Sequence, residues 1–361
     1  MGPLLPPRLS RRSALVRLIA GLAVAGACIY AMIVVAGGLP AAADQVRDAD
    51  LPWLIPAVGA ETVSYVFFGL QLRWLAGPGP QPRWRVWFQI ALVVYGLGSL
   101  TPASPVEGIV FAAGQLHRRG MTRRRAVLVL LLGQWTQFWA LVVVFAADRI
   151  VARGMGDLSR ADLASIIAGS AALVVATVAA AAVIRSRRAA EAAAVFLKVL
   201  PSQRGKTTAE LRAVAASWHD DIQQLLGPAS TRRAVFLTAM GGWMGDATCL
   251  WLALGSVGAR VGLEVVLLAY ALATVVAWIP LLPAGLGAVE IAIPAVLHRF
   301  GVPLVTGLAG TLIWRAISLL LPALAGFAAA IHLGLAKPAA EGAGPETSPG
   351  PAGPQRPAHP R

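Results

Sequence analysis

Charged side chains inside apolar segments are the residues of this sequence best placed to do chemistry. Glu61, Glu107, Asp246, Glu290 and Arg315 each lie within a long apolar window. Placing one such charge at the centre of a membrane helix costs on the order of 2 to 3 kcal/mol. We therefore take all five as candidates for binding or gating a substrate.

Arg315 is the sharpest of these candidates, because it keeps its charge and its planar fork suits a phosphate or a carboxylate. In one hypothesis it holds an anionic lipid headgroup while Glu290 gates or titrates. In the other, Arg315 and Glu290 form an ion pair that only pins a helical hairpin. Gln134 falls at the position of Arg315 in an internal repeat described below, so we expect an asymmetric site.

Glu61 and Asp246 occupy similar positions in two apolar segments. This placement suits two carboxylates that face one shared cavity. Hydroxyl groups nearby, those of Ser64, Tyr65 or Thr248, could equally satisfy them. Both interpretations stay open at the level of sequence.

Signatures of enzyme chemistry are missing from the sequence. It contains neither a P-loop nor a Gly-x-Ser-x-Gly elbow. No cluster of His, Cys and carboxylate residues has zinc spacing, and His117 and His298 read as interfacial residues beside arginines. We predict no enzymatic activity, no metal and no cofactor.

The elements that carry these residues are those of an integral membrane protein. Of the 361 residues 57% are hydrophobic and 13% are charged, and the mean hydropathy is +0.68. The net charge of +14 comes largely from basic clusters between apolar segments, which predicts their cytoplasmic side. We expect a multi-pass protein of the cytoplasmic membrane with both termini inside and membrane lipids, not nucleic acid, as partners.

Windows of about 20 apolar residues recur through the chain. They predict an all-α membrane domain over residues 18–333, after a basic cytoplasmic N-terminus (1–17) and before a disordered Pro/Gly/Ala-rich tail (334–361). The acidic stretch from Asp44 to Asp50 reads as an external loop. Six full spans are expected: 18–39, 51–72, 126–147, 163–184, 235–256 and 304–333.

Two further apolar segments are broken by prolines and glycines, which lipid does not tolerate unless protein or a water-filled cavity satisfies the backbone. We predict that each is a re-entrant hairpin with both ends on one side of the membrane. The segments are Val86–Leu116, broken at Pro102 and Pro105, and Leu263–Leu297, broken at Pro283, Gly285 and Gly287.

An offset of 181 residues aligns the two broken segments with each other. Pro102-Ala103 then matches Pro283-Ala284, and His117-Arg-Arg-Gly120 matches His298-Arg-Phe-Gly301. The basic clusters predict opposite orientations for the two units, and inverted repeats with broken helices are typical of secondary transporters. Two independent hairpins with chance similarity are the alternative.

The longest polar stretch, residues 185–233, is predicted to be a cytoplasmic loop with an amphipathic helix. Its apolar stripe either lies on anionic lipid or covers the ends of the spans. The stripe consists of Leu211, Val214, Trp218, Ile222 and Leu225.

One motif set resembles a known family. The set consists of Leu282-Pro-Ala-Gly-Leu-Gly-Ala-Val-Glu290, Phe300-Gly-Val-Pro303 and Trp314-Arg315, followed by Pro322 and Gly326. Together these residues resemble the flippase-like transmembrane region of lysylphosphatidylglycerol synthases and its stand-alone relatives. The resemblance implies lipid translocation. It does not extend to an aminoacyltransferase domain, and the absence of a base between Val110 and Gln115 puts the family's substrate specificity in doubt.

We therefore expect a flippase or transporter for an anionic phospholipid or a polyprenyl-phosphate-linked glycolipid. An alternative is a non-transporting membrane partner that docks a lipid-modifying enzyme or a glycosyltransferase through residues 185–233. A third possibility is an exporter of small solutes, coupled to protons through Glu61 and Asp246.

Overall fold

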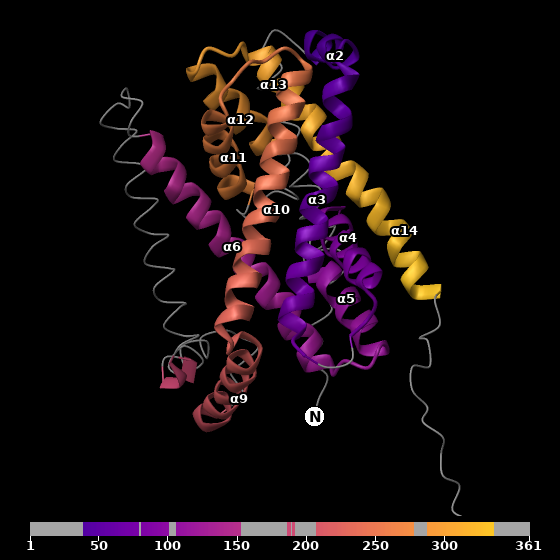
Figure 1. Ribbon diagram of the computed structural model, residues 1–361, viewed down its shortest axis with the longest axis vertical. Helices are drawn as coiled ribbons and strands as arrows, with labels where there is room; N and C mark the ends of the chain where they lie inside the picture. The colour runs from indigo at the N-terminus through magenta and orange to yellow at the C-terminus, as the bar shows by residue number, and fades with distance from the viewer. Residues whose placement is uncertain are drawn as a thin grey trace, which may run out of the picture.

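The chain is helical throughout its described part. A computed structural model describes residues 39–78, 81–100, 106–152, 186–188, 190–191, 207–277 and 287–335, and the regular elements within these ranges are all helices (Figure 1). They are α2 (Leu39–Arg47), α3 (Leu51–Ala76), α4 (Trp84–Leu100), α5 (Val106–Arg118), α6 (Arg123–Ala152), α9 (Thr208–Leu226), α10 (Ala229–Ser256), α11 (Leu263–Ala277), α12 (Ala288–Arg299), α13 (Leu304–Arg315), the π-helical segment η5 (Ala316–Leu320) and α14 (Leu321–Leu335).

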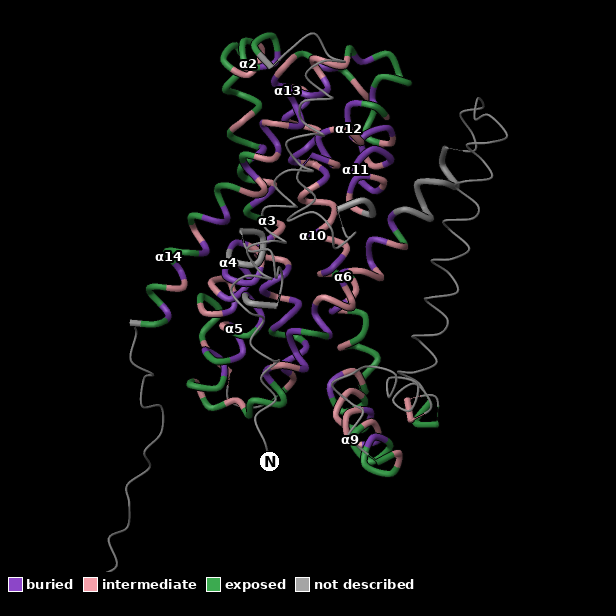
Figure 2. Tube along the Cα trace, turned by 180° about the vertical axis from the view of Figure 1, so that it is seen from behind, coloured by how far each residue is buried: buried purple, intermediate pink, exposed green. Residues whose placement is uncertain are grey.

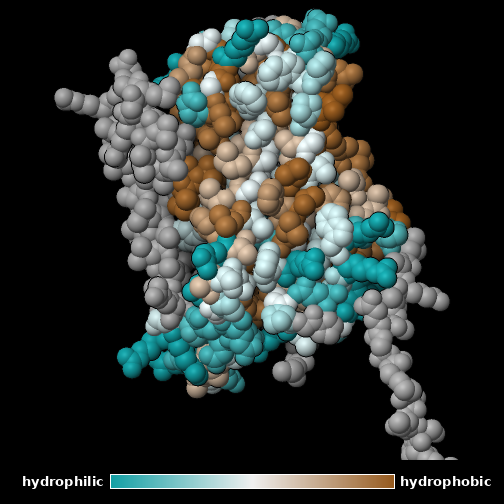
Figure 3. Space-filling view, in the orientation of Figure 1, coloured by the Kyte–Doolittle hydropathy of each residue, from teal (hydrophilic) through white to brown (hydrophobic). Residues whose placement is uncertain are grey.

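Among the described residues, three stretches are long and apolar enough to cross a membrane: Leu51–Ala76, Arg123–Val144 and Leu304–Gly334. Figure 3 shows the matching surface, with pale and hydrophobic side chains in a middle band and hydrophilic side chains at both ends. The chain is thus an all-α membrane protein. Of the other expected spans, 235–256 lies within α10, whereas 163–184 and nearly all of 18–39 lie outside the described residues.

Each predicted hairpin supplies two helices, α4 and α5 in the first and α11 and α12 in the second. The breaks between them lie outside the described residues, except for Gly287 at the start of α12. The expected external loop from Asp44 to Asp50 is wrong in one respect, because its first residues belong to α2. Arg47, in the last turn of α2, lies 3.7 Å from the carboxylate of Asp44.

Helices recur in the same order at the 181-residue offset. The sequence α3, α4, α5, α6 is followed by α10, α11, α12 and the stretch from α13 to α14. The turns after α5 and α12 match in detail: His117 Nδ1 lies 2.9 Å from the carbonyl oxygen of Met121, and His298 Nδ1 lies 3.2 Å from that of Val302. Gly120 and Gly301 both have positive φ, +92° and +86°, a conformation that favours glycine.

The two sets of helices exchange packing partners. α3 lies along α10 through the middle of the molecule, while α4 packs on α14 and α11 packs on α6 (Figure 1). Side-chain hydrogen bonds also connect one set with the other. Tyr65 Oη of α3 donates to the carbonyl of Ser318 in η5, and Trp243 Nε1 of α10 donates to the carbonyl of Gln137 in α6. Ser318 and Gln137 are themselves 181 residues apart. The buried hydrophobic residues form two large clusters, one mainly from α3, α4, α5 and α6 and the other mainly from α10, α11, α12 and α13 (Figure 2).

A satisfied polar network joins α3, α6 and α10 within this interior. Gln137 Nε2 donates to Gln71 Oε1 over 2.8 Å, and Gln71 Nε2 donates to the carbonyl of Gly133 over 3.1 Å. Trp243 completes the network from α10. Sequence reasoning did not single out these glutamines, whose hydrogen bonds account for their burial in an apolar surrounding.

The predicted amphipathic helix is α9. Its N-terminus is a capping box: Thr207 Oγ1 accepts the Glu210 N–H, and Glu210 Oε2 accepts the Thr207 N–H. Most of its expected stripe faces the protein, with Leu211 and Leu225 buried and Trp218 and Ile222 packed against the core. Val214 is the exception and is 47% exposed.

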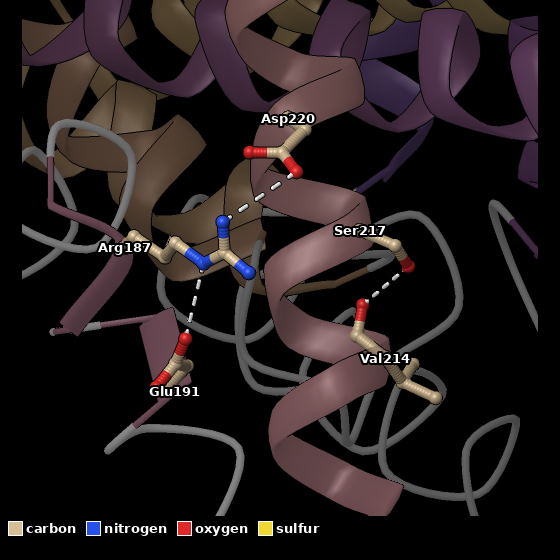
Figure 4. Close-up of polar contacts among 5 residues, drawn as sticks. All are labelled: Arg187, Glu191, Val214, Ser217 and Asp220. Carbon is tan, nitrogen blue, oxygen red and sulfur yellow. Dashed lines mark hydrogen bonds and ion pairs between the residues drawn. The ribbon is translucent and has the colours of Figure 1, made fainter.

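Arginine side chains form ion pairs with carboxylates on and beside α9. Figure 4 shows Arg187 between two carboxylates, with Nε 3.2 Å from Glu191 Oε1 and Nη1 3.9 Å from Asp220 Oδ2. On another face, Arg124 of α6 pairs with Asp221 and lies 5.8 Å from the Trp218 ring centroid. Such solvent-accessible pairs contribute little stability, so the apolar stripe is the main attachment of α9.

The contact between α4 and α14 predicts a strong effect of small substitutions. A Cβ at Gly96 would meet the carbonyl oxygen of Pro322, and a Cβ at Gly326 would meet that of Leu92. Backbone cannot move aside as a side chain can, so Gly96→Ala and Gly326→Ala should each destabilise the protein by about 1–3 kcal/mol. Thermal unfolding in detergent measures this. Gly114→Ala is the matched control, because nothing lies within 4 Å of its added methyl, and a Gly96→Ala protein as stable as this control would contradict the packing.

Candidate functional site

Glu290 and Arg315 form a buried ion pair. Glu290 is the third residue of α12, and its Oε2 accepts the Gly287 N–H at the helix start over 2.7 Å. Its Oε1 accepts Arg315 Nε over 2.9 Å, and the two side chains are only 8% and 13% exposed. One carboxylate thus fixes the start of α12 to the end of α13, at a helix N-terminus where negative charge is stabilised.

Asp246 of α10 accepts hydrogen bonds from two other helices. Tyr270 Oη of α11 donates to its Oδ2 and Trp314 Nε1 of α13 donates to its Oδ1, both over 2.7 Å. The Tyr270 and Trp314 rings lie edge to face with centroids 5.9 Å apart. Thr248, one of the hydroxyls considered as a partner, donates to the carbonyl of Met244 instead.

Glu61 of α3 is the carboxyl neighbour of Asp246. It is only 4% exposed, and its Oε2 has no hydrogen-bond partner within the described part of the chain. Tyr65, one turn further along α3, directs its hydroxyl to the carbonyl of Ser318 over 3.1 Å. The carboxyl groups of Glu61 and Asp246 therefore meet where α3 and α10 lie side by side.

These contacts join into one buried cluster, which we call the polar centre. Trp314 binds Asp246 and the next residue, Arg315, binds Glu290, so the two acidic sites share one turn of α13. The polar centre contains three carboxyl groups and one guanidinium group. Its members are Glu61, Tyr65, Asp246, Tyr270, Glu290, Trp314 and Arg315.

The π-helical segment η5 follows Arg315 directly and has a cause in the sequence. Pro322 has no N–H to give to the carbonyl of Ser318 four residues earlier, and its ring would crowd that carbonyl in an α-helix. The backbone widens to a π-turn instead, in which the Leu321 N–H reaches Ala316 O. Tyr65 supplies the donor that Pro322 cannot, so this irregular segment is bonded directly to α3.

Four of the six candidate residues from the sequence come together in the polar centre: Glu61, Asp246, Glu290 and Arg315. Gln134 lies in α6, where its buried Oε1 has no partner in the described ranges. Glu107 lies in α5, but its side chain is outside the described part. Of the break residues, Gly287 is described and donates to Glu290, whereas Pro102, Pro105, Pro283 and Gly285 are outside the described residues.

Sequence reasoning missed two members of the cluster. Trp314 was named only as part of the family motif and not as a site residue, and Tyr270 was not singled out. Their position was the available indication, because Trp314 adjoins the candidate Arg315 and Tyr270 is a hydroxyl within an apolar segment. In the described ranges, no group of three His, Cys, Asp or Glu side chains is arranged to hold a metal ion.

Comparison with known families gives a match over most of the chain. The family model described as the lysylphosphatidylglycerol synthase TM region covers residues 18–326. The chain belongs to this family. A search of the curated proteins finds no matching sequence.

Membership confirms the resemblance drawn from Pro283, Glu290 and Arg315, and it identifies the chain as a membrane domain related to lipid handling. Two of these residues form the ion pair of the polar centre. The matched region includes every helix from α2 to α13, together with η5 and the first turns of α14.

Removal of one partner of the buried pair should destabilise the protein strongly. Arg315→Gln removes the cation that binds Glu290, and Glu290→Gln removes the carboxylate that accepts from Arg315 Nε, each at an expected cost of about 3–5 kcal/mol. The double variant Glu290→Gln/Arg315→Gln removes both charges and should recover much of this loss. A double-mutant cycle on the free energy of unfolding measures the coupling. Additive effects of the two single substitutions would show that the pair does not stabilise the fold.

Tyr65→Phe should expose the role of the Tyr65 hydroxyl beside η5. The substitution leaves the part-buried carbonyl of Ser318 without its side-chain donor, at an expected cost of about 1–3 kcal/mol. Tyr95→Phe is the matched control, because Tyr95 packs on the Tyr65 ring with centroids 5.8 Å apart. Equal thermal stability of the two variants would contradict the proposed role.

Proposed function

We propose that this protein moves an anionic lipid, either a phospholipid or a polyprenyl-phosphate-linked glycolipid, across the cytoplasmic membrane. The observation that carries the proposal is the polar centre, which places the Arg315 guanidinium among carboxylates within a stretch that is apolar enough to cross a membrane, Leu304–Gly334. A purely structural membrane domain has no need of a buried ionic cluster drawn from α3, α10, α11, α12 and α13. The family's relation to lipid handling supports lipid as the substrate.

We infer an inverted repeat of six full spans and two re-entrant hairpins with both termini cytoplasmic. The recurrence of helices at the 181-residue offset supports this topology, as do the matched turns after α5 and α12. In Figure 1 the pair α4–α5 and the pair α11–α12 lie toward opposite ends of the long axis. In this arrangement, exchanged packing partners allow one half to move against the other around a fixed site.

The step at the site is an exchange of anions on Arg315. In the resting state Glu290 occupies the guanidinium. The guanidinium fork can bind a lipid phosphate through two parallel hydrogen bonds, whereas Glu290 accepts from Nε through Oε1 and gives its Oε2 to the Gly287 N–H, so the phosphate displaces the carboxylate. Glu290 keeps its bond to the Gly287 N–H, so α12 stays capped while α13 is released from it. The reaction involves binding and conformational change and no covalent chemistry.

Arg315→Gln is the sharpest test, since glutamine already stands at the equivalent position 134 of the other half. In proteoliposomes with fluorescent phosphatidylglycerol, loss of the bidentate charge should slow translocation by about tenfold or more, as for one charged hydrogen bond. Arg212→Gln removes an exposed arginine of α9 and should leave the rate unchanged.

A folded Arg315→Gln protein with full transport would remove Arg315 from the substrate site. If the wild-type protein moves no lipid, and a pull-down instead recovers a synthase or glycosyltransferase, the docking alternative replaces the transport proposal. Deletion of residues 207–226 separates the two cases further, because docking through this segment would be lost while transport would persist.

A further inference from the structure

The carboxyl groups of Glu61 and Asp246 form an unusual pair. They come from α3 and α10, the two helices that lie along each other through the centre of the molecule (Figure 1). Glu61 is almost completely buried and the two carboxyl groups interact directly. Two carboxylates so close in an apolar interior repel each other strongly, because little water screens them.

The hydrogen bonds divide the two carboxyl groups into different roles. Both oxygens of Asp246 accept a strong bond, one from Tyr270 and one from Trp314. Donors on both oxygens stabilise an ionised carboxylate. Glu61 Oε2, in contrast, is a buried oxygen without a partner in the described part of the chain. A proton on Glu61 removes the repulsion and provides a donor toward Asp246.

The titratable groups around Glu61 are consistent with this assignment. Tyr65 of α3, Tyr95 of α4 and Tyr270 of α11 face the pair, as does Cys249 of α10. These groups are neutral in their ordinary state. Arg315 of α13 acts on Asp246 and is itself bonded to Glu290 of α12. The guanidinium near Asp246 favours an anionic Asp246, and the repulsion between the two carboxyl groups then favours a protonated Glu61.

A metal cation fits this place poorly. Hard cations take six or more oxygen ligands, or retain several waters. Both Asp246 oxygens already accept hydrogen bonds, and an incoming cation would meet the Trp314 N–H beside one of them. A proton needs only the free Glu61 oxygen and its neighbour.

The pair is connected to the elements that would move in transport. Asp246 holds Trp314, whose neighbour Arg315 is the substrate residue of the proposed function. Tyr65, one turn from Glu61, holds the Ser318 carbonyl inside η5. A change of charge on the pair thus acts on Trp314, which precedes Arg315, and on the π-helical segment η5, which follows it.

We propose that Glu61 and Asp246 form a proton-binding site that couples lipid movement to a proton gradient. The coupling, though not the proton site, rests on the proposed transport function. In the step, the Glu61 O–H bond breaks, the proton passes to water that reaches the pair from one side, and Glu61 becomes a carboxylate. Rebinding of a proton from the other side restores the acid and resets the cycle.

Infrared spectroscopy tests the proton site without any transport. Protein in an alkyl maltoside, a detergent without carbonyl groups, should show the band of a protonated carboxylic acid at neutral pH. Glu61→Gln should abolish this band, while Glu264→Gln, which removes a carboxyl at the start of α11, should keep it. Absence of the band in the wild-type protein, or its persistence in Glu61→Gln, overturns the site.

A second variant keeps the test decisive if Glu61→Gln does not fold. In Asp246→Asn the acid proton of Glu61 loses its anionic acceptor, so the same band should move to higher frequency. An unchanged band overturns the pairing of the two groups.

Proteoliposomes test the coupling. With one proton per lipid, a one-unit pH gradient should build a lipid asymmetry of up to about tenfold, the ratio of the two proton activities. Glu61→Gln should show no asymmetry. Lipid that equilibrates without responding to the gradient overturns the coupling and leaves the proposed function standing. No lipid movement under any gradient overturns both, and the infrared band then decides the proton site alone.

Discussion

Polar groups within the apolar layer are costly unless they find partners inside the protein, and this constraint shapes the centre of the molecule. Pro322 illustrates how one residue propagates it. Its missing N–H leaves the Ser318 carbonyl unsatisfied, the helix widens into η5, and Tyr65 from α3 provides the donor. The same requirement places Tyr270 and Trp314 on Asp246. Side chains from α3, α10, α11 and α13 are thus held together by the hydrogen bonds that these buried groups require.

The two helical sets share a scaffold but not their chemistry. The turns after α5 and α12 coincide down to the histidine bond and the positive-φ glycine. At the centre they differ, because Arg315 corresponds to Gln134 and the π-winding of η5 has α-helical residues of α6 as its counterpart. The side chains of Gln71, Gln137 and Trp243 make their hydrogen bonds within their own network. The charged side chains around Arg315, in contrast, carry a net charge. This asymmetry supports the proposal that the substrate site lies in the half that contains Arg315.

The sequence was sufficient for the helical membrane class, the helical limbs of both broken segments and the family. Long apolar windows and motif spacing are local properties, so they survive without knowledge of packing. The charged residues were found for a related reason, since a charge in an apolar window is conspicuous wherever the helix lies. The partners of these charged residues could not be found from the sequence. Tyr270 meets Asp246 only because α10 and α11 pack together, and Glu61 meets Asp246 only through the contact of α3 with α10. The predicted stripe included the exposed Val214 for a different reason, because helical spacing shows which residues share a face but not how far the neighbouring protein covers that face.

Charge balance links the two proposals for the site. With Glu61 protonated, Asp246 and Glu290 still face the single positive charge of Arg315, so the polar centre carries a net negative charge. An incoming phosphate adds to that charge and separates Glu290 from its cation, which is unfavourable where little water screens it. The Gly287 N–H offsets part of this for Glu290. A proton held nearby offsets more, because the Glu61–Asp246 pair then carries one negative charge and not two. Anion binding at Arg315 and protonation at Glu61 should therefore favour each other, and linkage requires that this coupling be reciprocal.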